Sequence, residues 1–142
     1  MTKILVIEDE AAIRDKIVIV LKYENYEVIE APNGHEGVVS ARKNKPDLII
    51  CDVLMPDMNG YGALAALRDD PGTSVIPVIF LTAAASRADM RKGMELGADD
   101  YITKPYTVEE LLAAVRTRLE RQQAIKGRKS AGDTPMQSVS GP

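Results

Sequence analysis

Five short apolar runs, each of strand length, recur along the chain with longer amphipathic stretches between them, and this alternation constrains the fold more than any other feature. The runs cover residues 4–7, 26–31, 48–51, 78–81 and 98–102. Several are almost continuous Ile, Val and Leu, which is typical of a parallel sheet covered by helices on both faces. The sequence therefore predicts an α/β, doubly wound fold.

The stretches between the runs carry helix signals. The last stretch has the clearest apolar stripe with a period of about 3.6 residues, formed by Val108, Leu111, Leu112, Val115 and Leu119. Thr107 and Glu110 have the spacing of a capping box for this helix, and Ser86 with Asp89 offers a weaker cap to the helix before it. Gly97 suits the left-handed position that ends a helix.

A chain of 142 residues is long enough for one domain with an ordinary hydrophobic core. Because the periodic pattern stops near residue 124, we expect residues 1–123 to form the domain and residues 124–142 to be a flexible tail or a truncated linker. No apolar run approaches the roughly 20 residues that cross a bilayer, and the amino terminus lacks a signal peptide core. We therefore expect a cytoplasmic location and no membrane span.

The net charge of −3 at pH 7 argues against nucleic acid binding by this domain, because such binding depends on Lys and Arg at the phosphates. A basic cluster near the end of the chain is interpreted as a solvated helix end and linker; it comprises Arg121, Lys126, Arg128 and Lys129. The single cysteine, Cys51, lies in an apolar run and is expected to be a buried free thiol.

Polar side chains follow four of the expected strands, at the point where each strand ends. Glu8 and Asp9 follow the first strand, Asp52 the third, Thr82 the fourth and Lys104 the fifth. In sheets of this kind the connections are right-handed, and ligands bind beyond the carboxyl ends of the strands. The functional site is therefore expected at this edge.

Three carboxylates at neighbouring strand ends repel one another in a partly desolvated site, so we expect either a bound cation or a raised pKa. Oxygen ligands without His or Cys favour Mg²⁺. Lys104 and Thr82 suit the oxygens of a phosphoryl group in transfer, which makes Asp52 the natural nucleophile. Asp9 or Thr82 alone would be interpreted as a helix cap, whereas the whole set indicates phosphoryl chemistry.

These residues together resemble the response-regulator receiver family, from about residue 3 to residue 121. The matching pieces are Glu8-Asp9, Asp52-Val53-Leu54-Met55-Pro56 with Asn59-Gly60, Thr82-Ala83, Gly97-Ala98-Asp99-Asp100-Tyr101 and Lys104-Pro105. Each piece alone is weak, and their order at successive strand ends makes the match specific. The resemblance implies a flavodoxin-like, five-stranded parallel sheet with strand order 2-1-3-4-5.

The resemblance also implies the role of each residue. Asp52 would be phosphorylated by the phosphohistidine of a sensor histidine kinase or phosphotransfer protein, and Lys104 would pair with the phosphoryl oxygens. The Lys104-Pro105 peptide bond would be cis, which proline makes plausible. The metal ligands would be Asp9, Asp52 and the backbone carbonyl of Leu54, with Glu8 acting through water.

Thr82 and Tyr101 would form a switch pair, in which the threonine turns toward the phosphate and the tyrosine ring fills the space it leaves. Phosphorylation would add about 1.5 to 2 negative charges at Asp52 and reweight two conformations that are already close in energy. The change would appear on the face of the fourth helix, fifth strand and fifth helix. The alternative for Tyr101 is a surface ring packed on the last strand.

Relatives that drive winged-helix transcription factors often dimerise through this face, which suggests a homodimer. Its cross-pairs would come from Asp99, Asp100, Arg116 and Arg118. Ala114 and Tyr106 depart from the pattern of those relatives, with alanine in place of arginine and tyrosine in place of phenylalanine. Leu54 and Ala84 cannot orient a water molecule, so slow self-dephosphorylation is expected.

Two other functions stay open. A magnesium-dependent phosphatase would share the aspartate nucleophile, but it usually needs a second acid near the leaving group, and position 54 is leucine. A phosphate-independent pseudo-receiver scaffold would be expected to lack the acid pair, the acceptor or the lysine, and all are present. The favoured interpretation is a signalling switch rather than an enzyme, with only autocatalytic phosphoryl transfer and self-dephosphorylation.

Overall fold

A computed structural model describes the backbone of residues 1–83 and 87–132 and the side chains of residues 1–83 and 91–124. Within these residues, strands and helices alternate strictly along the chain. The strands are β1 (Lys3–Ile7), β2 (Glu27–Ala31), β3 (Leu48–Asp52), β4 (Val78–Thr82) and β5 (Asp100–Thr103). The helices are α1 (Ala11–Tyr23), α2 (Gly34–Asn44), α3 (Gly60–Asp69), α4 (Arg87–Glu95) and α5 (Val108–Gly132).

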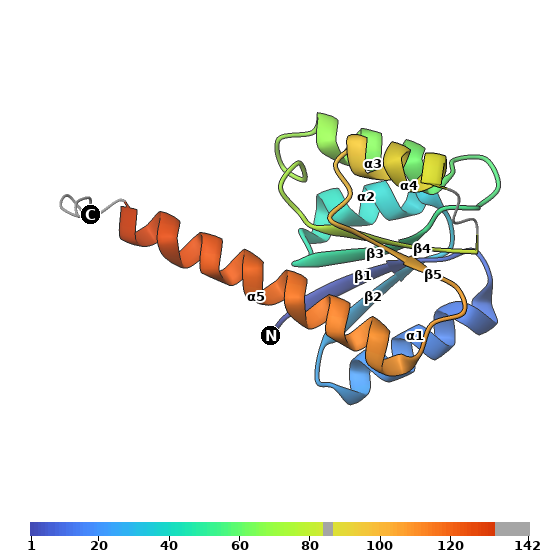
Figure 1. The fold of residues 1–142 in the computed structure, drawn as a ribbon, viewed down its shortest axis with the longest axis horizontal. Coiled ribbons are helices and arrows are strands. Elements are labelled where there is room, and N and C mark those ends of the chain that lie inside the picture. The colour runs from blue at the N-terminus through green and yellow to red at the C-terminus, as the bar shows by residue number, and fades with distance from the viewer. Residues whose placement is uncertain (84–86, 133–142) are drawn as a thin grey trace.

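The strands form one parallel sheet in the order β2-β1-β3-β4-β5. In Figure 1, α2, α3 and α4 lie on one side of the sheet and α1 and α5 on the other. The predicted fold class and strand order are therefore confirmed. The order reverses between β1 and β3, so the ends of these two central strands meet at the edge where a ligand is expected.

The sheet is buried on both faces, which explains why its central strands are continuous apolar runs. Every residue of β3 and β4 is buried. Alternate residues of one strand enter opposite cores: Ile49 joins Phe80 on one face, and Ile50 joins Leu111 on the other. Both layers therefore depend on strands that lack a polar side, as the sequence indicated.

The strand ends differ from the predicted bounds by small amounts that matter for the site. β3 and β4 each include one more residue than predicted, so Asp52 and Thr82 are the last residues of their strands. β5 begins two residues later than predicted, at Asp100, because Ala98 still donates to the Gly93 carbonyl of α4 at 3.0 Å. Gly97 has a φ of +101°, which confirms the left-handed helix end.

Local signals at the last helix are confirmed. The Thr107 N–H donates to Glu110 Oε1 at 2.8 Å, and the Glu110 N–H donates to Thr107 Oγ1 at 3.0 Å, which is a reciprocal capping box. Cys51 is buried and free, as expected. The weaker cap expected at Ser86, and the Ala84 side chain, lie outside the described residues.

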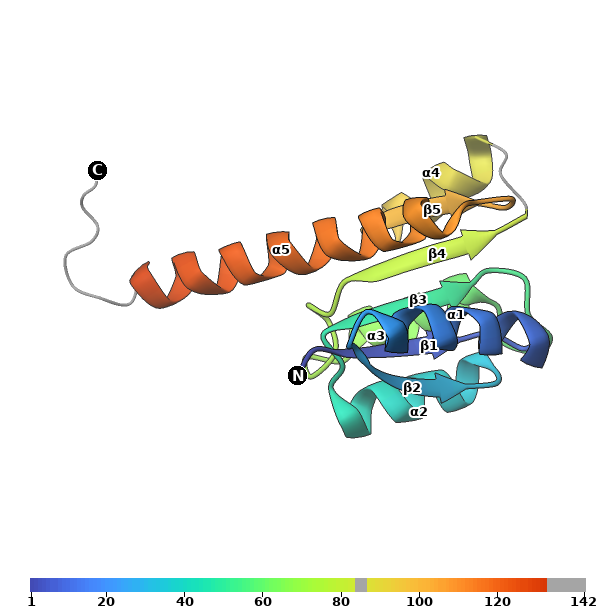
Figure 2. The same cartoon turned by 90° about the horizontal axis from the view of Figure 1, so that it is seen from below.

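α5 continues to Gly132, so residues 124–132 are helical in the part of the chain that was expected to be a flexible tail or a linker, and the domain boundary at residue 123 stays a prediction. Figures 1 and 2 both show α5 running well past the end of the sheet. A helix that has left the domain needs no apolar stripe, and Arg, Gln, Lys and Ala favour helix by intrinsic propensity. Among the described residues, no helix combines the length and apolar character that a membrane crossing requires.

Candidate functional site

Three acidic residues meet at the carboxyl edge of the sheet. Glu8 directly follows β1, and Asp52 ends the neighbouring strand β3, where Cys51 pairs with Ile7. Glu8 is 1% exposed and Asp52 is 6% exposed, while Asp9 is half-buried. One carboxylate oxygen from each lies within 4.8 Å of the others. The structure therefore brings the three acids together, as the sequence predicted.

Lys104 supplies the positive charge that faces these acids. It follows β5, where its N–H donates to the Thr82 carbonyl at 2.8 Å, and the Lys104–Pro105 peptide bond is cis. Its Nζ lies 3.7 Å from Glu8 Oε1 and 3.9 Å from Asp52 Oδ1. The ammonium thus sits between two buried carboxylates without closing a short ion pair with either.

Burial changes the acidity of the two inner carboxyl groups. It raises the pKa of Glu8 from its ordinary value of 4.5 to about 7; the N–H of Glu10 opposes this shift, and the charge of Asp52 adds to it. Burial also raises the pKa of Asp52, against the opposing charge of Lys104 and a hydrogen bond from the Leu54 backbone. The acids are therefore under-neutralised by the residues around them.

This donor set fits a hard divalent cation. Glu8 Oε1 is buried and has no hydrogen-bond partner among the described residues, although Oε2 of the same carboxylate accepts from the Glu10 N–H at 3.1 Å. Three carboxylates face one lysine, and the site offers oxygen ligands of the kind that Mg²⁺ prefers. Glu8, Asp9 and Asp52 are the residues that could hold it.

The raised pKa of Glu8 predicts a pH dependence of stability without metal. The folded state binds the Glu8 proton more tightly than the unfolded state, so its contribution is complete below pH 4.5 and is lost as pH rises through about 7. Relative to Glu8→Gln, the free energy of unfolding should fall by up to about 3 kcal/mol across this window, at about 1.4 kcal/mol for each unit of pKa. Urea unfolding of both proteins in EDTA measures the difference. A constant difference across the window would contradict the burial argument.

Thr82 and Tyr101 occupy the neighbouring strands β4 and β5. Thr82 ends β4 and is fully buried. Tyr101 is only 8% exposed, so the surface-ring alternative is wrong. Its ring packs edge-on against Phe80, with 6.0 Å between centroids, and its hydroxyl lies 3.3 Å from that of Tyr61.

Tyr61 is a residue that the sequence reasoning missed. It lies on the inner face of α3, 9% exposed, and its ring also packs edge-on against Phe80 at 5.4 Å. The available signal was a hydroxyl-bearing ring directly after Asn59-Gly60, at the start of a helix whose apolar face must meet the sheet. α3 thereby contacts the ring that is expected to switch.

Two short-range hydrogen bonds hold the loop that follows Asp52. Asn59 caps α3 by accepting from the Gly62 N–H at 2.9 Å, and the Gly60 N–H donates to the Val53 carbonyl at 2.9 Å. Leu54 itself is largely exposed. Its described contact is the backbone hydrogen bond to the Asp52 carboxylate, so a metal-binding role of its carbonyl stays a prediction.

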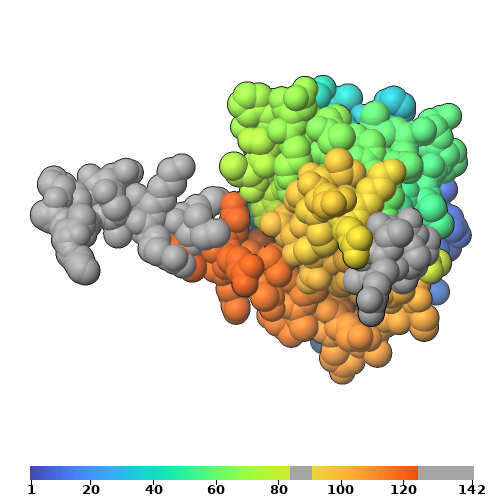
Figure 3. All heavy atoms as spheres, turned by 45° about the horizontal axis from the view of Figure 1, so that its top comes forward, coloured from blue at the N-terminus to red at the C-terminus, as the bar shows by residue number. Residues whose placement is uncertain are grey.

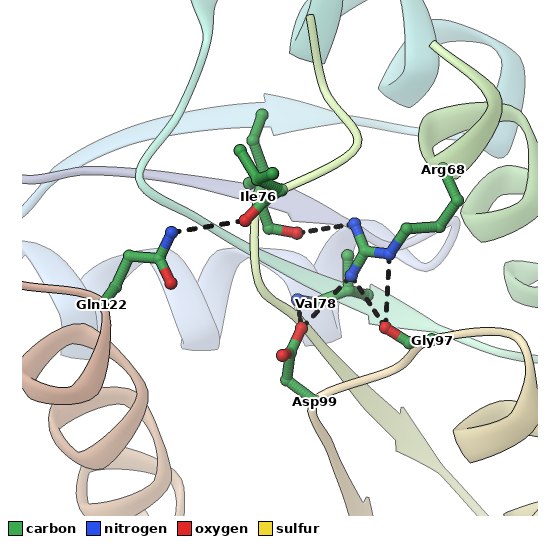
Figure 4. Close-up of polar contacts among 7 residues, drawn as sticks. Arg68, Ile76, Val78, Gly97, Asp99 and Gln122 are labelled. Atoms are coloured by element: carbon green, nitrogen blue, oxygen red, sulfur yellow. Dashed lines mark hydrogen bonds and ion pairs between the residues drawn. The ribbon is translucent and has the colours of Figure 1, made fainter. Parts of the chain in front are cut away.

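Asp99, one of the residues expected to form cross-pairs in a dimer, is bonded within the chain. Its Oδ2 lies 3.2 Å from Arg68 Nη2 and accepts from the Val78 N–H at 2.8 Å. Figure 4 shows that Arg68 also reaches the carbonyls of Gly97 and Ile76, at 2.8 and 2.7 Å. Asp99 therefore ties the start of β5 to the end of α3. That Asp100, Arg116 and Arg118 form cross-pairs in a dimer stays a prediction.

The profile of the response regulator receiver domain matches residues 4–116. A probable transcriptional regulatory protein of Picosynechococcus sp. is 44% identical over 96% of this chain and 54% of its own length. The DNA-binding dual master transcriptional regulator RpaA of Synechocystis sp. is 42% identical over 88% of this chain and 52% of its own length. The chain thus spans about half the length of these relatives.

Among solved structures, the receiver domain of a sensor histidine kinase from Pseudomonas aeruginosa is similar to this chain. It superposes with a TM-score of 0.78 at 28% identity, covering 84% of this chain and 98% of its own. That protein holds a magnesium ion coordinated in its active site cleft.

Proposed function

Because this chain belongs to the response regulator receiver domain family, we propose that Asp52 is the residue that accepts the phosphoryl group. The observation that carries the proposal is the position of Asp52, buried at the end of β3 with Glu8, Asp9 and Lys104 around it. A buried carboxylate beside a lysine and two further acids is an arrangement suited to phosphoryl transfer rather than to fold stability alone.

The proposed reaction is a direct displacement at phosphorus. An Asp52 carboxylate oxygen forms a bond to phosphorus as the bond to the donor's imidazole nitrogen breaks, and the electron pair of that bond leaves with the imidazole. Lys104 Nζ, already 3.9 Å from Asp52 Oδ1, neutralises charge on the transferred oxygens. The Thr82 hydroxyl, at the end of the adjacent strand, donates to one of them.

We propose Mg²⁺ as the resident ion, held by Asp9, Asp52 and the Leu54 carbonyl, with Glu8 acting through water. When bound, it supplies positive charge that offsets the acids and the incoming phosphoryl oxygens. Two observations support this assignment: the crowded, buried acids, and Glu8 Oε1, which has no hydrogen-bond partner among the described residues and only the charge of Lys104 nearby. So does the magnesium ion of the similar Pseudomonas aeruginosa domain.

The proposed output surface is the face of α4, β5 and α5. In Figure 3 the described end of α4, residues 91–95 in yellow, lies between α3, in green, and the first turns of α5, in orange. Tyr101 of β5 connects this face to the site through its packing on Phe80. Phosphorylation would reweight the Thr82 and Tyr101 positions and so change what binds the face, a second copy included.

The likeness to longer regulators supports a proposal for the whole protein. We propose that residues 1–123 are the receiver domain and that the helix over residues 124–132 leads toward an output domain in a second half of the protein, because this chain spans only 52% of the DNA-binding regulator RpaA. Nucleic acid contact would belong to that half and not to this acidic domain. The phosphoryl donor would be a sensor histidine kinase or phosphotransfer protein.

Intact-mass analysis after incubation with acetyl phosphate and Mg²⁺ tests the acceptor function. We expect one phosphate adduct with Mg²⁺ and almost none when EDTA replaces it. An unmodified chain under both conditions would contradict the proposal. With excess phosphomonoester, sustained release of phosphate would instead indicate the phosphatase alternative, which none of the comparisons favours.

A further inference from the structure

Arg14 of α1 bonds to the backbone of the segment that carries the acid pair. Its Nη1 donates to the backbone carbonyl of Glu8 at 2.7 Å, and its Nε lies 3.3 Å from Glu30 Oε1 of β2. The Arg14 side chain is only 17% exposed. One guanidinium therefore joins α1, the end of β1 and β2.

The carbonyl that Arg14 holds belongs to the peptide linking Glu8 to Asp9. Because a peptide unit is planar, fixing this carbonyl also fixes the direction in which the Asp9 backbone departs. The other side of Glu8 is fixed as well, since its N–H donates to the Ala31 carbonyl at 3.1 Å. Removing Arg14 would free the carbonyl side of Glu8, which is the side that leads to Asp9.

Arg14 is itself well anchored. Its N–H donates to the Glu10 carbonyl at 2.9 Å, as a first-turn hydrogen bond of α1. Glu30 fixes the far side of the guanidinium. A side chain held at both its base and its tip can impose a position on the strand end that a mobile surface arginine cannot.

We propose that Arg14 is a positioning residue of the metal site, which sets the geometry of Glu8 and Asp9 for Mg²⁺ by holding the carbonyl between them. The inference rests on the proposed magnesium site. Partners that orient metal ligands typically change metal affinity by about 10- to 100-fold when they are lost. For Arg14 we expect a change near the low end of this range, because it acts on the backbone and not on a ligand atom.

The direction in which Mg²⁺ affinity changes when Arg14 is removed distinguishes a positioning role from an effect of its charge. Arg14 is a cation close to a cation site, so if charge alone mattered, its removal would strengthen Mg²⁺ binding. Positioning predicts the opposite, a weaker affinity. A purely structural role predicts lower stability with an unchanged Mg²⁺ Kd.

The experiment is a Mg²⁺ titration by calorimetry of the unmutated chain and of Arg14→Met, which keeps the aliphatic stem and removes the donors. We expect a Kd about tenfold higher for Arg14→Met. The rate of phosphorylation by acetyl phosphate should fall at low Mg²⁺ and recover at saturating Mg²⁺. If Arg14→Met does not fold by circular dichroism, Arg14→Lys serves instead, since it keeps the charge and cannot make both contacts.

Two controls are matched to the variant. Glu30→Gln removes the charge of the partner but keeps an oxygen that can accept from Arg14 Nε, so Arg14 stays anchored and the Glu8 carbonyl bond remains. Lys3→Met removes a side-chain bond to the Asn44 carbonyl at the opposite end of β1. Both should bind Mg²⁺ within about twofold of the unmutated chain. An Arg14→Met Kd that is equal or lower would overturn the inference. Failure of the unmutated chain to bind Mg²⁺ would overturn the proposed metal site itself.

Discussion

Asp52→Asn should eliminate the phosphate adduct completely, because an amide has no carboxylate oxygen to attack phosphorus. The change should also raise the stability of the metal-free domain by about 1 kcal/mol, since it removes one charge from three crowded acids. The amide oxygen can still accept the Leu54 backbone hydrogen bond, so the loop should keep its position. Intact-mass analysis with acetyl phosphate and Mg²⁺, together with urea unfolding in EDTA, measures both effects.

Asp57→Asn is the matched control. Asp57 lies in the loop that follows, is exposed, and has a φ of +64°, which asparagine also tolerates. The fraction of Asp57→Asn that carries a phosphate adduct should equal that of the unmutated chain. An adduct that persisted in Asp52→Asn, or one that disappeared in Asp57→Asn, would move the acceptor away from Asp52.

Gly60→Ala should have the largest effect on stability, about 3 kcal/mol. A Cβ at Gly60 would lie 2.7 Å from the Asp52 carbonyl oxygen and 2.9 Å from the Val53 Cα, so backbone and not a flexible side chain obstructs it. α3 would have to move away from the end of β3, which would lengthen the Gly60 hydrogen bond to Val53. Phosphorylation should slow with it, because the displaced loop is the one that follows Asp52.

Gly62→Ala provides the comparison on the same helix. Its Cβ would meet only the Met58 side chain at 3.2 Å and Asn59 Oδ1 at 3.8 Å. Alanine favours helix over glycine by up to about 1 kcal/mol, so this variant should be neutral or slightly more stable. Equal stability losses in the two variants, measured by urea unfolding, would show that the close approach at Gly60 is not the cause.

The sequence predicted the sheet and the cluster of acids well because both follow from regular patterns. Continuous runs such as residues 48–51 indicate a strand buried on both faces, and parallel strands deliver Glu8, Asp52 and Lys104 to one edge. The capping box at Thr107 depends only on residues three apart, so it too was predictable.

The contacts that were not predicted link residues far apart in the chain. Tyr61 meets Tyr101 across 40 positions, and Arg68 meets Asp99 across 31, and no local pattern encodes either pairing. Arg14 looked like an ordinary polar position of an amphipathic helix until its distance to the Glu8 carbonyl was known. The helical extension to Gly132 was missed for a different reason, because a helix without a packing partner carries no apolar stripe.

Because α5 is long, a change of its tilt at the domain moves its far end. Gln122 ties the helix to the domain by donating to the Val75 carbonyl at 3.3 Å. Residues 123–132 then extend about 15 Å further, at a helical rise of about 1.5 Å per residue. A tilt of about 10° at the base would displace the far end by roughly 3 Å, given that rise. A small repacking beside β5 that tilted the helix would therefore reach the residues beyond Gly132 as a sideways movement.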